Sequence, residues 1–166
     1  MKEQLILIVF LMLLLITSCS KTEKTGYVKM GELFEEFELK KQLANQLEQT
    51  VNARKNLLDS LKLNLEMMVV GIQGDATNDS LKEVFLYSKE QYLAKQQQFE
   101  SENQQLQQQY DNQIWTQLNE YVEDYGEEQE FAYIFGADGT GAIMYGNASN
   151  DITKELIKYA NQKFLG

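Results

Sequence analysis

The long central part of the chain carries apolar residues at helical spacing. From about residue 32 to residue 125 the sequence is rich in Leu, Gln, Glu and Lys. The turn formers of residues 71–79 interrupt this pattern once, and Ser80 with Glu83 then fits a capping box for a second helix. We therefore expect an antiparallel helical hairpin over residues 39–125, with its tip near residues 71–79.

The expected first helix carries a heptad seam, in which spacings of three and four alternate. Its members are Ala44, Leu47, Val51, Arg54, Leu58, Leu61, Leu65 and Met68. In the second helix an aromatic or leucine recurs every seven residues from Phe85 to Leu106, but the alternate seam positions are polar, near Ser88, Gln96 and Asn103. The pattern predicts a coiled-coil-like arm that is loosely packed toward its tip and better packed at its root.

Strand-like runs flank the hairpin on both sides. Residues 26–30 alternate in the β manner, and residues 131–135 and 142–145 do so again around an Asp-Gly turn signal. A last helix is expected over residues 152–164, with Asn150 or Asp151 as its N-cap. Segments 26–38 and 126–166 are therefore expected to form a small α/β body. The fold class is α+β and mostly α.

The N-terminal residues have the pattern of an export signal. An apolar run over residues 5–16 follows a short charged start, and it is too short to span a bilayer, which needs about 20 residues. The small residues before Cys19 resemble the lipobox of bacterial lipoproteins. We expect residues 1–18 to be a cleaved signal, Cys19 to carry lipid, residues 19–25 to form a polar tether, and Ser20 to favour the outer membrane. The alternative is an ordinary secretory signal with an incidental cysteine.

Composition narrows the classes of function. The formal net charge is −10 over 166 residues, which argues against a nucleic-acid partner. The chain has no histidine and one cysteine, so a nucleophile–base pair or a zinc site is difficult to assemble. Its carboxylates show no calcium-loop spacing. We therefore expect no enzymatic activity, no metal and no cofactor.

Charge is distributed unevenly along the expected arm. Residues 52–95 contain six basic and six acidic side chains. Between Lys95 and Lys154 there is no basic residue, whereas eleven acidic ones occur. The tip half of the arm is therefore neutral overall and the root is acidic. A solvated helix face is the simplest interpretation of most of these charges.

Two motifs at the ends of the body segments are more specific. Residues 27–34 read Tyr-Val-Lys-Met-Gly-Glu-Leu-Phe, and residues 150–153 read Asn-Asp-Ile-Thr. With the order of the elements, they resemble the Skp/OmpH family of periplasmic chaperones over about residues 27–164. That resemblance implies a jellyfish-shaped homotrimer, in which three arms surround a cavity for unfolded outer-membrane proteins. Familiar members are basic and soluble, whereas this chain is acidic and carries a lipobox.

The resemblance also implies that short strands join the copies in the body. The candidate strand residues are Tyr27, Val28, Met30, Phe131, Tyr133, Ile134, Phe135, Ile143 and Tyr145. On the arm, Met67 and Tyr87 lie off the seam and are candidates for client contact, whereas Phe85, Tyr92 and Phe99 are expected to join the two helices. The leading hypothesis is a membrane-anchored, ATP-independent periplasmic holdase for unfolded outer-membrane proteins. The alternative is a structural or tethering lipoprotein whose coiled arm binds a fixed partner.

Overall fold

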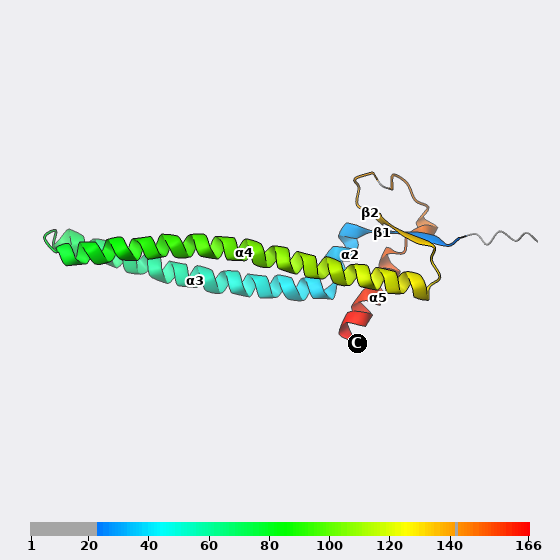
Figure 1. Ribbon diagram of the computed structural model, residues 1–166, viewed down its shortest axis with the longest axis horizontal. Coiled ribbons are helices and arrows are strands. Elements are labelled where there is room, and N and C mark those ends of the chain that lie inside the picture. The colour runs from blue at the N-terminus through cyan, green and yellow to red at the C-terminus, as the bar shows by residue number, and fades with distance from the viewer. Residues whose placement is uncertain (1–22, 142) are drawn as a thin grey trace, which may run out of the picture.

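The computed structural model describes residues 23–141 and 143–166 (Figure 1). The expected signal peptide and Cys19 lie outside the described residues. Within the described part, no helix has the length and hydrophobicity needed to cross a membrane. The elements in order are β1 (Thr25–Lys29), α2 (Met30–Glu36), α3 (Glu38–Gly74), α4 (Asp79–Glu128), β2 (Tyr133–Ala137), the 3-10 turn η2 (Ala148–Asn150) and α5 (Thr153–Leu165).

Helices α3 and α4 form a thin antiparallel arm that projects from a small body (Figure 1). Helix α3 has 37 residues and α4 has 50, because the root of α4 continues across the body. At about 1.5 Å per residue, α3 alone reaches roughly 55 Å. The predicted mostly helical α+β fold with a long hairpin is confirmed.

The contact between the two helices follows the predicted seam closely. From Leu47 to Met68 every seam residue of α3 is half-buried, and only Ala44 is exposed. On α4, Ser88 and Asn103 take the polar seam positions, but Gln96 is exposed and Lys95 occupies its place. The heptad spacing therefore predicted the packing of α3 almost completely and that of α4 to within one residue.

The helical region breaks at Phe37, where the sequence predicted continuous helix. Phe37 is extended (φ −74°, ψ 127°) and its side chain is only 1% exposed. Its ring packs edge-on against Tyr121 and Phe164, with centroid distances of 6.1 and 5.6 Å. The Asn161 side chain accepts from the Glu38 amide (2.8 Å) and donates to the Glu36 carbonyl (3.0 Å). Asn161, which is distant in the sequence, thus satisfies two backbone groups that the break leaves free.

The tip is tighter than predicted, and its cap is different. Helix α3 continues through residue 71 to Gly74, so the turn occupies only residues 75–78. Asn78 caps α4, since its side-chain oxygen accepts from the Leu81 amide at 3.0 Å. The predicted capping box at Ser80 is therefore wrong. Asn78 is an equally good N-cap residue placed at the end of a shorter turn.

The body contains a two-stranded parallel sheet, in which Tyr27 of β1 is opposite Phe135 of β2. The whole arm is the crossover connection between these parallel strands. Helices α2 and α5 and the root of α4 pack around the sheet. The buried core consists of Val28, Leu33, Phe37, Leu39, Leu43, Ile114, Leu118, Ile152, Leu156 and Ala160.

Four candidate strand residues lie outside the strands. Met30 is the first residue of α2, and Phe131 precedes β2. Ile143 and Tyr145 belong to an irregular loop, so the second predicted run after the hairpin is not a strand in this chain. Gly139 and Gly141 have φ values of +80° and +106° there, and the turn they make leads away from β2. Strand β2 pairs with β1 instead.

A cluster of hydrogen-bonded polar side chains joins the end of β1 to the start of α5. The Thr153 hydroxyl is buried, accepts from the Lys29 amide (3.0 Å) and donates to Asp151 (2.5 Å). Lys29 Nζ lies 2.8 Å from the other Asp151 oxygen. Hydrogen bonds from Lys29 and Thr153 lower the pKa of Asp151 to about 2. Helix α5 begins at Thr153 with Ile152 as its N-cap and without a side-chain cap, so the predicted N-cap at Asn150 or Asp151 is wrong. Asp151 lies one residue before the cap and accepts from the Thr153 amide at 3.1 Å.

Candidate functional site

The arm exposes apolar side chains where a folded monomer would normally hide them. Met67 is 57% exposed and Tyr87 is 65% exposed, so both side chains are free for contact with another molecule. Phe99 is buried, and Phe85 and Tyr92 are half-buried on the seam, as expected for residues that join the helices. The full set of exposed large apolar residues on the arm is Leu57, Leu63, Met67, Val69, Val70, Val84, Leu86, Tyr87 and Leu93.

The middle of the arm is held by a cluster that the sequence showed only as a charged interruption. Arg54 Nη2 donates to Glu102 Oε2 at 2.7 Å, and Arg54 Nη1 donates to Asn103. Its guanidinium lies 5.3 Å from the Phe99 ring centroid, and Lys95 Nζ lies 5.0 Å from the same centroid. The Phe99 ring interacts with both cations, and Glu102 and Asn103 accept hydrogen bonds from Arg54. These contacts compensate the charge of Arg54 inside the seam. The signals in the sequence were the charged residue Arg54 in the first seam and the polar position near Asn103 in the second.

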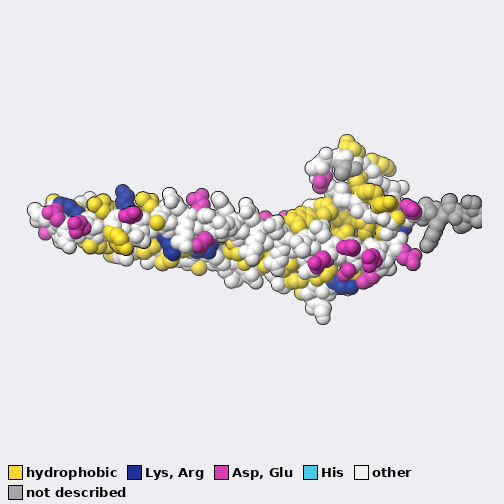
Figure 2. All heavy atoms as spheres, viewed as in Figure 1, with side chains coloured by type: hydrophobic (Ala, Val, Ile, Leu, Met, Phe, Trp, Pro, Cys, Tyr) yellow, Lys and Arg dark blue, Asp and Glu magenta, His cyan; other side chains and the backbone are white. Residues whose placement is uncertain are grey.

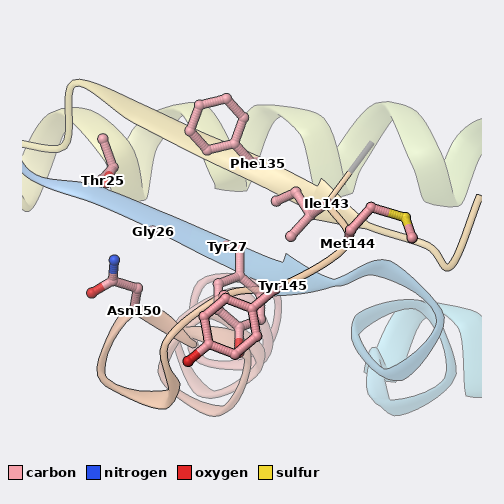
Figure 3. A pocket seen from close by; sticks show the side chains of 9 residues that line it. Thr25, Gly26, Tyr27, Phe135, Ile143, Met144, Tyr145 and Asn150 are labelled. Atoms are coloured by element: carbon pink, nitrogen blue, oxygen red, sulfur yellow. The ribbon is translucent and has the colours of Figure 1, made fainter. Parts of the chain in front are cut away.

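The body carries a second exposed apolar area. Tyr133 and Phe135 of β2 are 59% and 48% exposed, and their rings stack with centroids 5.9 Å apart. Phe135 also lines an open cavity of about 530 Å³, which lies beside β1 (Figure 3). The other lining residues are Thr25, Gly26, Tyr27, Ile143, Met144, Tyr145, Gly146 and Asn150.

The candidate body residues separate into two groups in the structure. Val28 is buried in the core, and Ile134 and Phe131 are partly buried against it. Tyr27, Phe135, Ile143 and Tyr145 instead line the cavity (Figure 3). Gly146 contacts the Tyr27 ring so closely that any Cβ would collide with it. The loop after β2 is thereby held against β1.

Acidic side chains gather over the body end of the molecule, while hydrophobic patches recur along the arm (Figure 2). In the part of the chain that the structure describes, no three acidic or cysteine side chains approach closely enough to bind a metal ion together. The exposed apolar residues of the arm and of the sheet are candidate contact surfaces.

Comparison with known proteins agrees with this architecture. A crystal structure from Caulobacter crescentus CB15, described as a candidate outer membrane chaperone (OmpH-like), has the same fold, with a TM-score of 0.74. The two share 14% sequence identity, and the match covers 85% of each chain. A search of curated proteins finds no significant match. The family model for outer membrane protein (OmpH-like) matches residues 24–159, and the chain belongs to this OmpH-like family.

Proposed function

We propose that this protein is a membrane-anchored, ATP-independent periplasmic holdase for unfolded outer-membrane proteins. Membership of the OmpH-like family, with its similarity to an OmpH-like outer membrane chaperone, supports a chaperone role. The observation that carries the finer proposal is the arm, a thin hairpin with exposed apolar side chains on both helices. Such a surface binds other apolar chains, because each contact removes apolar area from water.

We further propose that the working form is a homotrimer. A two-stranded sheet has little stability of its own, and within the described residues the outer edge of β2 pairs with no further strand. The exposed Tyr133–Phe135 pair and the cavity beside Tyr27 supply apolar area next to that edge. Second and third copies of the chain would cover these surfaces and place three arms around a common cavity.

The proposed lipid on Cys19 would fix the direction of the arms. The described chain begins at the end of the body that faces away from the arm tip (Figure 1). Lys24 is held there, since its carbonyl accepts from the Ala132 amide at 2.8 Å and its ammonium group donates to the Gln129 carbonyl at 2.7 Å. A lipid a few residues earlier would hold the body near the outer membrane, with the arms pointing into the periplasm.

The rival function is a tethering lipoprotein that binds one fixed partner. In-cell photocrosslinking from position 67, followed by mass spectrometry of the products, distinguishes the two. We expect a spread of outer-membrane proteins crosslinked by Met67→benzoylphenylalanine, and few products from the same group placed at seam residue Leu65. A single stoichiometric partner would contradict the holdase and support the tether.

A further inference from the structure

The exposed apolar residues of the arm all lie toward its tip. All nine fall between Leu57 and Leu93, on either side of the turn at residues 75–78. Within residues 38–56 and 94–128, which form the root, no large apolar side chain has comparable exposure. The apolar surface and the acidic surface of the arm therefore occupy different halves of its length.

One face of α3 shows this change directly. Leu63, Met67 and Val70 are exposed and lie opposite the seam, because Leu63 is rotated by about 200° from the seam residue Leu61. The residues eighteen positions earlier, or about five helical turns, are Asn45, Gln49 and Asn52, which are also exposed. The same helix face is thus polar at the root and apolar at the tip.

Helix α4 also changes from polar at the root to apolar at the tip, although its sequence runs from the tip to the root. Leu86 and Tyr87 are 64% and 65% exposed near the tip. The positions about five turns nearer the root are Gln104 and Gln105, both exposed. Because both helices change from polar to apolar at corresponding ends, the difference follows position along the arm and is not confined to one element.

We infer that the tip half of the arm, from Leu57 to Leu93, is the surface that grips clients, and that its occupant is an extended, apolar segment of unfolded polypeptide. This inference rests on the proposed holdase function. It assigns the acidic root and the polar face at Asn45, Gln49 and Asn52 no part in apolar contact. The face opposite the α3 seam, with Leu63, Met67 and Val70, is its most continuous part.

The positions of the exposed apolar side chains in the tip half favour an unfolded polypeptide as the occupant. Leu86 and Tyr87 follow the seam residue Phe85 by about 100° and 200°, so they lie on different sides of α4, and Leu63 and Met67 lie behind α3. A rigid folded partner would need one continuous face, whereas a flexible chain can follow several. Methionine and leucine side chains adapt to varied partners. The balanced charge of residues 52–95 also suits a segment with no particular net charge.

The test uses the full mature chain and exchanges the two triplets of α3. Variant L63N/M67Q/V70N removes the tip surface. A second variant adds N45L/Q49M/N52V to these changes, which restores the composition but places the apolar triplet at the root. All six residues are exposed and off the seam, so both variants should keep the wild-type helix content and unfolding temperature. The probe is a urea-unfolded outer-membrane barrel protein diluted into buffer, and aggregation is followed by light scattering.

We expect both variants to require about tenfold more protein than wild type for half-maximal protection, since three apolar contacts are lost at the tip. Full protection by the first variant would overturn the assignment of the tip surface while leaving the holdase intact. Recovery of protection in the exchanged variant would show that apolar area matters and its place does not, which also overturns the inference. If wild-type protein gives no protection, the proposed function and the inference both fail.

Discussion

Replacing Phe37 with alanine is expected to destabilise the body by about 3–5 kcal/mol, as is usual for truncation of a buried aromatic residue. Phe37 is 1% exposed, and its ring joins α4 to α5 through Tyr121 and Phe164. The change would leave a cavity at the junction of the arm and the body. It would also remove the packing that holds the extended backbone between α2 and α3.

Trp115 provides the measurement, since it is the only tryptophan of the chain and stacks on Phe34 at the root of the arm, 4.8 Å between ring centroids. Its fluorescence, followed during denaturant unfolding at one fixed protein concentration, reports the free energy of unfolding. Leu165→Ala is the matched control in the body, because Leu165 is 67% exposed and should cost less than about 1 kcal/mol. A Phe37→Ala loss as small as that of the control would contradict the role given to Phe37.

Replacing Cys19 with alanine is expected to abolish maturation of the protein completely. In the lipoprotein that we propose, the lipid would be attached to the Cys19 sulfur, and removal of residues 1–18 would depend on that cysteine. Intact mass measured on protein extracted from cell membranes should show a lipidated chain starting at Cys19 for wild type. The variant should keep residues 1–18 and carry no lipid.

Ser20→Ala is the control for the Cys19 experiment, because it leaves the cysteine in place and should give a lipidated chain that differs in mass from wild type only by the serine oxygen. If wild-type protein has a free thiol and no added lipid mass, the anchor is wrong. The body would then have no fixed distance from the membrane, and the proposed direction of the arms would fail with it.

The arm could be predicted from the sequence because its structure depends on local periodicity. The residues from Leu47 to Met68 recur at spacings that only a helix can place on one side, and the structure buries that side. The exposure of Met67 and Tyr87 follows from the same geometry, since a residue off the seam of a two-helix arm has no partner to cover it. Here the sequence contained enough information to locate a candidate surface.

The body was harder to predict because its structure depends on distant contacts. The break at Phe37 is stabilised by Asn161, which is more than a hundred residues away in the sequence. No helix-breaking residue beside Phe37 predicts this break. The parallel pairing of β1 with β2 joins segments on either side of the whole arm. The run around Ile143 has strand-like residues but pairs with no strand among the residues that the structure describes. Short strands take their pairing from tertiary context, and so their alternation alone did not decide it.

The Arg54 cluster is a third case. The sequence showed a charged residue in the seam but did not show which residues accommodate it. A charged residue in a heptad seam ordinarily weakens the seam, although it can also fix the register of the helices. In the structure Glu102, Asn103 and the Phe99 ring surround the guanidinium. The partner residues lie on the other helix, about fifty positions away, so only the hairpin register reveals them.

The most direct test of the holdase is light scattering from an unfolded outer-membrane barrel protein diluted out of urea, with and without the purified mature chain and in the absence of ATP. The account predicts that scattering is suppressed once the chain is present at a few-fold molar excess, because the exposed arm residues cover the apolar segments that would otherwise associate. Undiminished scattering at that excess, from protein whose helix content and mass are intact, would contradict the central claim.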